Sequence, residues 1–323
     1  MSDAQTNDWA AGIVTVSLNP AIDQTASIPN FAPDAVNRVV WEQADPGGKG
    51  VNVSSFLADF GYPSTATGLL GRDNPELFER LFEQKGIGDR LVRIAGKTRI
   101  NVKIVDDAQQ QVTDINFPGQ SPTADDLEEL LTVIDGLATD QDWFVLAGSV
   151  PEGVPSRFYH DLIVRLKQQG RKVMLDTSGD RLQEAIAANP NVIKPNIAEL
   201  QDILGQTLDS ELAIVEAARN LIQQGLQLVV VSMGADGALF VDRDAAVHAQ
   251  PPAIEVKSTV GAGDAMVAGT LAGLVQGKSL EDCARLGTAF SMGALTQIGP
   301  RLPRTDVVLA NQSRVSLRSV EEF

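Results

Sequence analysis

The residues best placed to do chemistry lie in a glycine turn, Thr259-Val-Gly-Ala-Gly-Asp264, which is followed at once by the small and apolar run of residues 265–275. This run predicts a helix that carries Asp264 in its first turn. Backbone N–H groups at a helix start lack partners and attract anions, so the turn could hold a phosphoryl group. Asp264 could then accept the proton of an attacking hydroxyl. The motif suggests phosphoryl transfer, although plain helix capping would use the same residue types.

A second glycine cluster, Asp45-Pro-Gly-Gly-Lys-Gly-Val-Asn52, precedes another stretch of helical length. Glycines such as Gly48 let a ligand approach the backbone closely. Lys49 could bind an anion as a point charge, and Asn52 could reach sugar hydroxyls from the first helical turn. Neither cluster has the spacing of a Walker loop or of G-x-G-x-x-G, which disfavours a Rossmann dehydrogenase.

Two further polar turns follow apolar strands. In Lys194-Pro-Asn-Ile-Ala-Glu199, Asn196 and Glu199 have the spacing of a capping box, which alone would explain both residues. A cation, an amide and a carboxylate at one strand end could also organise the phosphates of a nucleotide and its magnesium-bound waters. The turn Ser232-Met-Gly-Ala-Asp-Gly237 could admit an adenine or a ribose.

Composition limits the kinds of partner. The chain has 323 residues, 43% of them hydrophobic, and a formal net charge of −16. That charge argues against binding to nucleic acid or an anionic membrane, so an anionic substrate must be caught by local cations. A single cysteine, Cys283, and two histidines exclude an internal disulfide and a zinc-ligand cluster. The sequence contains no signal-peptide pattern and no membrane-spanning run, so we expect a soluble, cytoplasmic protein.

The elements that must position these motifs alternate between strands and helices, which is typical of an α/β core. Valine- and isoleucine-rich runs predict strands at residues 13–17, 65–69, 143–147, 172–176, 192–194 and 228–232. Amphipathic stretches predict helices at residues 51–60, 76–85, 156–169 and 210–224, each followed by a glycine. Ligands of parallel sheets gather at the carboxyl ends of the strands, and the polar motifs mostly follow strands.

Two stretches, residues 21–44 and 98–117, lack helical periodicity. Alternation in Arg99-Ile-Asn-Val-Lys-Ile-Val105 predicts an extended strand, and residues 106–110 predict a hairpin turn after it. We expect a small β-sheet inserted from two places, which could act as a lid, although an ordinary edge hairpin would show the same pattern. The chain is therefore expected to form one domain, residues 1–323, with a β-lid built from these two stretches.

Together, the motifs resemble the ribokinase-like superfamily, in its phosphofructokinase B branch of sugar-phosphate kinases, over about residues 13–305. The signatures are Gly47-Gly-Lys-Gly-Val-Asn52 and Thr259-Val-Gly-Ala-Gly-Asp264. Shorter matches are Asn19-Pro-Ala-Ile-Asp23, Gly148-Ser-Val-Pro151, Lys194-Pro-Asn-Ile-Ala-Glu199 and Ser232-Met-Gly-Ala-Asp-Gly237. The resemblance implies an ATP-dependent kinase with a three-layer α/β/α core, a mostly parallel sheet and a small β-sheet lid, usually a homodimer paired through its lids.

The resemblance also implies roles for individual residues. Asp264 would be the general base, and the anion hole would be formed by the amides of Gly261, Ala262, Gly263 and Asp264. The sugar phosphate would be bound by Asp23, Gly48, Lys49, Asn52, Arg99, Lys103 and Ser149, with Arg38 as a weaker candidate. ATP would be bound by Lys194, Asn196, Glu199, Ser232, Gly234 and Gly237, and Mg²⁺ would be held through water by Asn196 and Glu199.

The segments at residues 96–104 and 112–119 resemble 1-phosphofructokinases. They imply transfer of the ATP γ-phosphoryl group to the C6 hydroxyl of fructose 1-phosphate, giving fructose 1,6-bisphosphate. Residues 46–48 and 295–302 are nearer to minor 6-phosphofructokinases, and tagatose 6-phosphate is a third acceptor. Adenosine and ribose kinases are disfavoured because the lid carries cations suited to a phosphorylated acceptor. A catalytically silent sugar-phosphate sensor is the alternative from another class, and the intact charged residues of the motifs argue against it.

Overall fold

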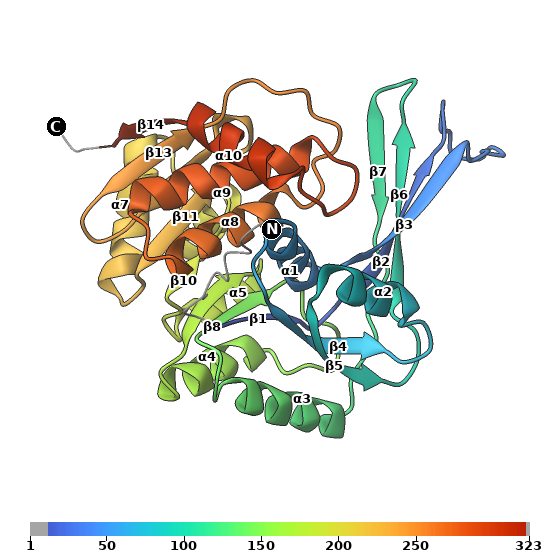
Figure 1. Cartoon of the computed structure of the whole chain (residues 1–323), viewed down its shortest axis with the longest axis horizontal. Coiled ribbons are helices and arrows are strands. Elements are labelled where there is room, and N and C mark those ends of the chain that lie inside the picture. Colours follow the sequence, from blue (N-terminus) through green and yellow to red (C-terminus); the bar gives the residue numbers. More distant parts are fainter. Residues whose placement is uncertain (1–11, 321–323) are drawn as a thin grey trace, which may run out of the picture.

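The computed structural model describes residues 12–320. A ten-stranded sheet forms the centre of this part of the chain (Figure 1). The order of its strands is β14-β13-β12-β11-β10-β9-β8-β1-β4-β5. Their bounds are β1 Ile13–Ser17, β4 Thr65–Gly71, β5 Gly88–Ile94, β8 Trp143–Ala147, β9 Lys172–Asp176, β10 Val192–Ile193, β11 Leu228–Ser232, β12 Ala238–Val241, β13 Ala246–Gln250 and β14 Ser316–Ser319. Residues 2–11, where we expected no export signal, lie outside the described range.

The strands from β5 to β11 in this order run parallel, and β12, β13 and β14 add an antiparallel edge. All six strands expected from the sequence are present, and β1, β8, β9 and β11 have the expected bounds. Strand β10 stops at Ile193, one residue short, because Lys194 already belongs to the turn that follows it. The mostly parallel sheet places the carboxyl ends of β8, β9, β10 and β11 along one edge.

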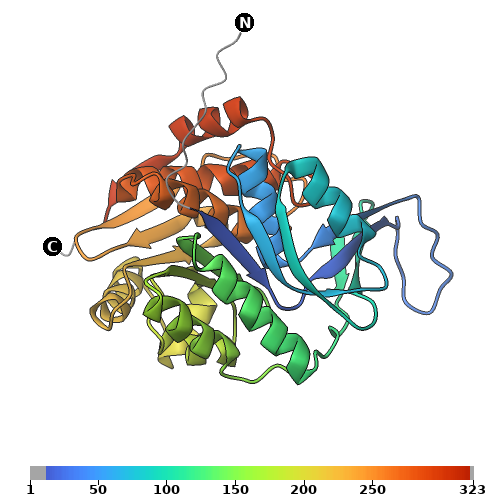
Figure 2. The ribbon, with the colours of Figure 1, turned by 60° about the horizontal axis from the view of Figure 1, so that its bottom comes forward.

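Helices cover both faces of the sheet, which gives the expected three-layer α/β/α architecture (Figure 2). One face carries α3 Ala124–Leu137, α4 Phe158–Gln168, α5 Asp180–Ile186, α6 Ile197–Leu204 and α7 Glu211–Gln223. The other carries α1 Lys49–Asp59, α2 Glu76–Lys85, α8 Ala262–Val275, α9 Leu280–Leu295 and α10 Thr305–Arg314. Side chains alternate along each strand, so Val14 packs into one layer and Ile13 into the other.

A second, four-stranded sheet stands away from the core, at the upper right of Figure 1. Its order is β3-β2-β6-β7, with β2 Ala21–Ser27, β3 Trp41–Gly47, β6 Arg99–Asp106 and β7 Gln111–Ile115. Strands β6 and β7 form the expected hairpin, and β6 also pairs in parallel with β2. The sheet buries few side chains of its own, chiefly Ala26, Ile28 and Ile104. We refer to it below as the small sheet.

Helix α8 is buried along almost its whole length and packs closely against α9. A Cβ atom added at Gly269 would lie 2.7 Å from the carbonyl oxygen of Leu286 and 2.8 Å from Cγ of Phe290. Glycine is therefore needed there for the two helices to approach. Although α8 is strongly apolar, no helix within residues 12–320 is long and apolar enough to cross a membrane. The close packing fixes the start of α8, where Asp264 lies.

We predict that Gly269→Ala lowers the free energy of unfolding by about 1–3 kcal/mol, because the added methyl group overpacks the contact with α9. The matched control is Gly136→Ala in α3, where an added Cβ would meet nothing within 4 Å. That change should raise the free energy of unfolding by about 0.4–1 kcal/mol, because alanine lowers the conformational entropy of the unfolded chain. Urea unfolding measures both. Equal effects at the two positions would contradict the proposed α8–α9 constraint.

Candidate active site

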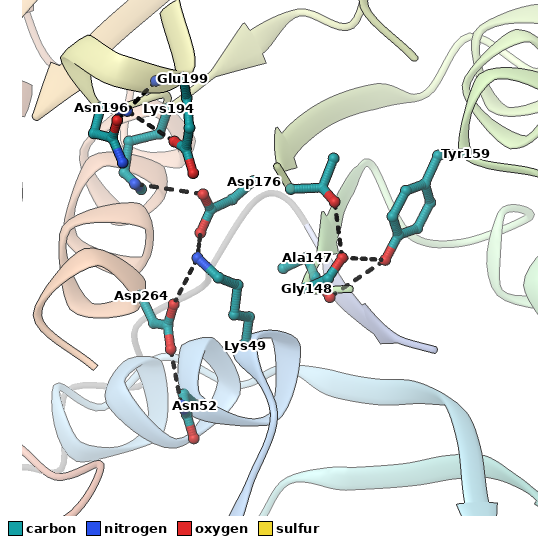
Figure 3. A network of polar contacts seen from close by, with 11 residues as sticks. Lys49, Asn52, Ala147, Gly148, Tyr159, Asp176, Lys194, Asn196, Glu199 and Asp264 are labelled. Carbon is teal, nitrogen blue, oxygen red and sulfur yellow. Dashed lines mark hydrogen bonds and ion pairs between the residues drawn. The ribbon is translucent and has the colours of Figure 1, made fainter. Parts of the chain in front are cut away.

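Four charged side chains meet beyond the carboxyl end of the parallel sheet (Figure 3). Asp176, at the end of β9, lies with Oδ2 3.0 Å from Nζ of Lys49 and Oδ1 3.4 Å from Nζ of Lys194. Nζ of Lys49 also lies 3.6 Å from Oδ1 of Asp264, whose Oδ2 accepts a 2.8 Å hydrogen bond from Nδ2 of Asn52. We call Lys49, Asp176, Lys194 and Asp264 the charged cluster. It joins the starts of α1 and α8 to the ends of β9 and β10.

The two carboxylates of the charged cluster have opposite pKa shifts. Burial by itself raises the pKa of Asp176, but Lys194 and Lys49 outweigh burial and hold the pKa below its ordinary value. Burial also raises the pKa of Asp264, and there Lys49 and Asn52 do not outweigh it because the charge of Asp176 adds to the effect. Burial alone would lower the pKa of Lys49, yet Asp176 and Asp264 raise it. Asp176 therefore stays charged, while Asp264 has the raised basicity that a proton acceptor needs.

The glycine turn before Asp264 leaves the start of α8 open beside a cation. Gly261 has φ 76°, in the left-handed region that favours glycine, and an added Cβ would lie 3.2 Å from Cζ of Phe56. A Cβ added at Gly263 would lie 3.5 Å from Nζ of Lys194. The N–H groups of Ala262, Gly263 and Asp264 occupy the first helical turn and have no partner within the helix. An anion at this helix start would meet both free amides and an ammonium group.

The polar turn after β10 is the capping box that the sequence predicted. The backbone N–H of Asn196 donates to Oε2 of Glu199 (2.9 Å), and the N–H of Glu199 donates to Oδ1 of Asn196 (2.8 Å). The turn lies against the end of β11, since the N–H of Ser232 donates to the carbonyl of Pro195. Gly234 and Gly237 follow with φ 62° and 89°. Lys194, Asn196, Glu199, Ser232, Gly234 and Gly237 therefore lie along one edge of the sheet.

A cavity of about 400 Å³ lies between the small sheet and the core. The small sheet contributes Asp23, Asn101 and Lys103, and the core contributes Asn52 and residues 257–260 and 298–300. Nδ2 of Asn101 donates to Oδ1 of Asp23 (3.0 Å), and burial raises the pKa of Asp23 despite this hydrogen bond. The cavity reaches the charged cluster through Asn52, which contacts Asp264. Gly48, the residue before Lys49, has φ 115°. A Cβ atom added at Gly48 would lie 2.9 Å from Cα of Pro20.

Five expected sugar-phosphate residues lie outside the lining of this cavity, namely Gly48, Lys49, Arg99, Ser149 and Arg38. Arg99 donates from Nη2 to the carbonyl of Asn19 and from Nη1 to the carbonyl of Phe117, both at 2.9 Å, and burial lowers its pKa. The hydroxyl of Ser149 accepts a hydrogen bond from Nδ2 of Asn19. Arg38 is exposed in the loop between β2 and β3. Arg99 and Ser149 thus both hold the Asn19 segment that leads into the small sheet.

Sequence reasoning missed Asp176, the residue that contacts both lysines of the charged cluster. One signal was available, because an acid at the carboxyl end of a buried strand is unusual unless it is paired. The partners of that acid could not be found from spacing, since Lys49 precedes it by 127 positions. Asn101 was missed for the same reason, as its contact with Asp23 requires the parallel pairing of β2 and β6.

Comparison with known proteins shows to which protein family this chain belongs. The model of the pfkB family of carbohydrate kinases matches residues 13–306. The chain belongs to the pfkB family. A 1-phosphofructokinase from Rhodobacter capsulatus is 49% identical over 309 residues, covering 95% of this chain and 98% of that relative.

Solved structures give the same assignment for this pfkB-family chain. Phosphofructokinase-2 from Escherichia coli in complex with substrates and products superposes with a TM-score of 0.88 at 29% identity, covering 94% of this chain and 98% of the other. A tetrameric inhibited form of that enzyme gives a TM-score of 0.86 at 28% identity, with the same coverage. A ribokinase from Arabidopsis thaliana superposes with a TM-score of 0.74 at 23% identity, covering 94% of this chain and 98% of the other, which confirms the ribokinase-like fold expected from the sequence.

The opposite pKa shifts predict opposite effects of two matched substitutions at pH 7. Asp176→Asn should lower the free energy of unfolding by about 3 kcal/mol, because it leaves the buried Lys194 without its carboxylate. Asp264→Asn should raise it, because the ionised form of Asp264 is disfavoured in the fold.

The pH dependence follows from the same signs. The contribution of Asp176 is present above the ordinary carboxyl pKa and is lost as pH falls through its lowered pKa. The penalty from Asp264 instead disappears as pH falls through its raised pKa, so its variant should lose its advantage in acid. Thermal unfolding of both variants from pH 2 to 8 tests this, and shifts of the same sign at pH 7 would contradict it.

Proposed function

We propose that this chain transfers the γ-phosphoryl group of ATP to the C6 hydroxyl of fructose 1-phosphate, giving fructose 1,6-bisphosphate and ADP. The observation that carries the proposal is the position of Asp264, which lies at an open helix start and contacts Asn52 in the wall of a cavity suited to a sugar phosphate. Among ketohexose monophosphates, fructose 1-phosphate is favoured by the likeness to the 1-phosphofructokinase of R. capsulatus.

Lys194, Asn196 and Glu199 would bind the ATP phosphates, and Ser232, Gly234 and Gly237 would line the nucleoside. The capping box uses one oxygen of Glu199 and leaves the other free. One free carboxylate oxygen suits Mg²⁺, which keeps most of its waters and is bound by few protein oxygens. No group of three or more His, Cys, Asp or Glu residues in the described chain forms a dedicated metal site, which agrees with a metal that arrives with the nucleotide. Bound Mg²⁺ would supply neutralisation of phosphate charge.

In the proposed reaction, Asp264 orients the C6 hydroxyl and accepts its proton as the hydroxyl oxygen bonds to the γ-phosphorus. The bond between that phosphorus and the bridging oxygen breaks, and ADP leaves with the electron pair. The amides of Gly261, Ala262, Gly263 and Asp264 would hold the transferring group, helped by Lys194. Asn52 and Lys49 fix the two oxygens of Asp264, so that the base needs little reorganisation.

The sugar would lie in the cavity with its hydroxyls on Asp23, Gly48, Lys49 and Asn52, while Ser149 would fix the neighbouring segment. Lys103 lines the cavity and would face the phosphate. Arg99 shares the face of β6 that carries Lys103, and its guanidinium has N–H groups beyond those that donate to the carbonyls of Asn19, Pro20 and Phe117. Arg99 could therefore donate a hydrogen bond to the phosphate group of the sugar. Closure of the small sheet as a lid, residues 21–44 and 98–117, would exclude water from the site.

Release of ADP measured with fructose 1-phosphate, fructose 6-phosphate, tagatose 6-phosphate and unphosphorylated sugars tests the proposal. We expect the highest kcat/KM with fructose 1-phosphate. A preference for either other phosphate would assign the tagatose or minor 6-phosphofructokinase alternative. Absence of turnover on every sugar, with binding retained, would favour a sensor.

In the same assay, Asp264→Asn should lower kcat by about 10²–10⁴-fold with little change in KM, because the base acts mainly in the transition state. The control is Asp135→Asn, an acid on α3 that pairs with Arg165 on the far face of the sheet. Near-normal turnover of the Asp264 variant would contradict the assignment of the base.

We also propose a homodimer paired through the small sheet. Asp23, Asn101 and Lys103 of this sheet line the cavity, whereas the apolar side chains of Ile100, Ile115 and Phe117 are exposed and do not line it. Contiguous exposed apolar side chains on a sheet favour association with another chain. The tetrameric form of the E. coli relative gives precedent for association in the family. An ATP-dependent reaction also fits the cytoplasmic location expected from the sequence.

Ile115→Lys should shift the protein toward monomer in sedimentation velocity, because it places a charge on the proposed interface. Leu309→Lys on α10 is the matched control, since it makes the same change at another exposed site. A wild-type monomer, or equal effects of both changes, would contradict pairing through the small sheet.

A further inference from the structure

Two lysines line the cavity from opposite walls. Lys103 lies on β6 of the small sheet, and Lys257 lies on the core segment that leads to the glycine turn. The motifs that indicated the site include Lys103 but not Lys257. Because the whole chain carries a net charge of −16, an anionic ligand must be held by cations at the site itself.

The carboxylates of the cavity wall already have partners. Asp114 pairs with Lys103, and Asp45 lies 2.7 Å from Nη2 of Arg301. Asp107 accepts a hydrogen bond from the hydroxyl of Ser27, and Asp23 accepts one from Asn101. Within residues 12–320, Lys257 makes no ion pair. Of the two cavity lysines, it is therefore the one whose charge is not balanced by a carboxylate.

The backbone of Lys257 is fixed although its side chain is exposed. Its N–H donates to the carbonyl of Leu295 at 2.8 Å, and the N–H of Ser258 donates to the same oxygen at 3.3 Å. Leu295 ends α9, which packs against α8. The ammonium group thus sits on a rigid support on the core side, within the same segment that delivers Asp264. A flexible four-carbon stem on a fixed base suits capture of a compact dianion.

We infer that Lys257 binds the phosphate group that the sugar substrate already carries, and that it does so from the core side, opposite Lys103. This inference rests on the proposed function. The reacting hydroxyl must face Asp264, so the phosphate at the other end of a ketohexose lies away from the charged cluster and needs cations of its own. Lys257 supplies a cation that is not paired with a carboxylate. It acts as a specificity residue, because a sugar without a phosphate gains nothing from it.

The test compares Lys257→Met with wild type in steady-state kinetics. KM for fructose 1-phosphate should rise by about tenfold or more through loss of a charge-assisted hydrogen bond. The kcat and the KM for ATP should stay near wild type, since Lys257 does not touch the reacting atoms. Activity on unphosphorylated fructose should be unaffected, and Lys257→Arg should restore most of the affinity for the phosphate. Circular dichroism checks that the variants are folded.

Lys278→Met is the matched control. Lys278 follows the other end of α8, is exposed and does not line the cavity, so its loss changes the net charge equally without touching the site. A KM for fructose 1-phosphate that is unchanged in Lys257→Met, or raised equally in Lys278→Met, would overturn the inference. If wild type prefers another sugar phosphate, the proposed substrate is wrong. The same comparison on that preferred substrate then supports or overturns the role of Lys257 separately.

Discussion

The active centre depends on one buried carboxylate between two lysines. Asp176 is almost inaccessible to solvent and contacts Lys49, at the start of α1, and Lys194, directly after β10. A charge buried in this way is tolerated only when its partners are close, so the ends of β9 and β10 and the start of α1 must stay in register. The basicity of Asp264 follows from the same arrangement. Burial is the main cause of the raised pKa of Asp264. Lys49 partly offsets it, and the negative charge of Asp176 adds to it.

Local sequence was sufficient for most of the core. The bounds of β1, β8, β9 and β11 agreed with their valine-rich runs, because a strand buried on both faces must be apolar throughout. The helix end at Gly86 agreed as well, since this residue adopts the left-handed conformation that ends a helix. The antiparallel edge was missed. Strand β14 is short and mostly exposed, so it carries no apolar run by which it could be found.

In the functional site, too, local features could be predicted from the sequence and contacts between distant segments could not. Motifs that use consecutive residues, such as the glycine turn and the capping box, were read correctly as local structures. Contacts between distant segments could not be predicted from the sequence. Arg99 stays a predicted phosphate ligand, and no pattern in the strand reveals its hydrogen bonds to the carbonyls of Asn19, Pro20 and Phe117. Asp176 and Lys257 likewise gain their significance only from residues that the fold brings near them.

The parallel pairing of β2 with β6 also bears on how the chain folds. Asp23 and Asn101 are 78 positions apart, and the chain between them forms β3, α1, β4, α2 and β5. Strands separated in this way meet only after the intervening loop has been closed, which is entropically slow. The small sheet has almost no core of its own to form earlier. Because the small sheet buries so few side chains of its own, we expect the core that carries Asp264 to hold it in place, so that a chain still in the process of folding gains the base before it gains an enclosed place for a substrate.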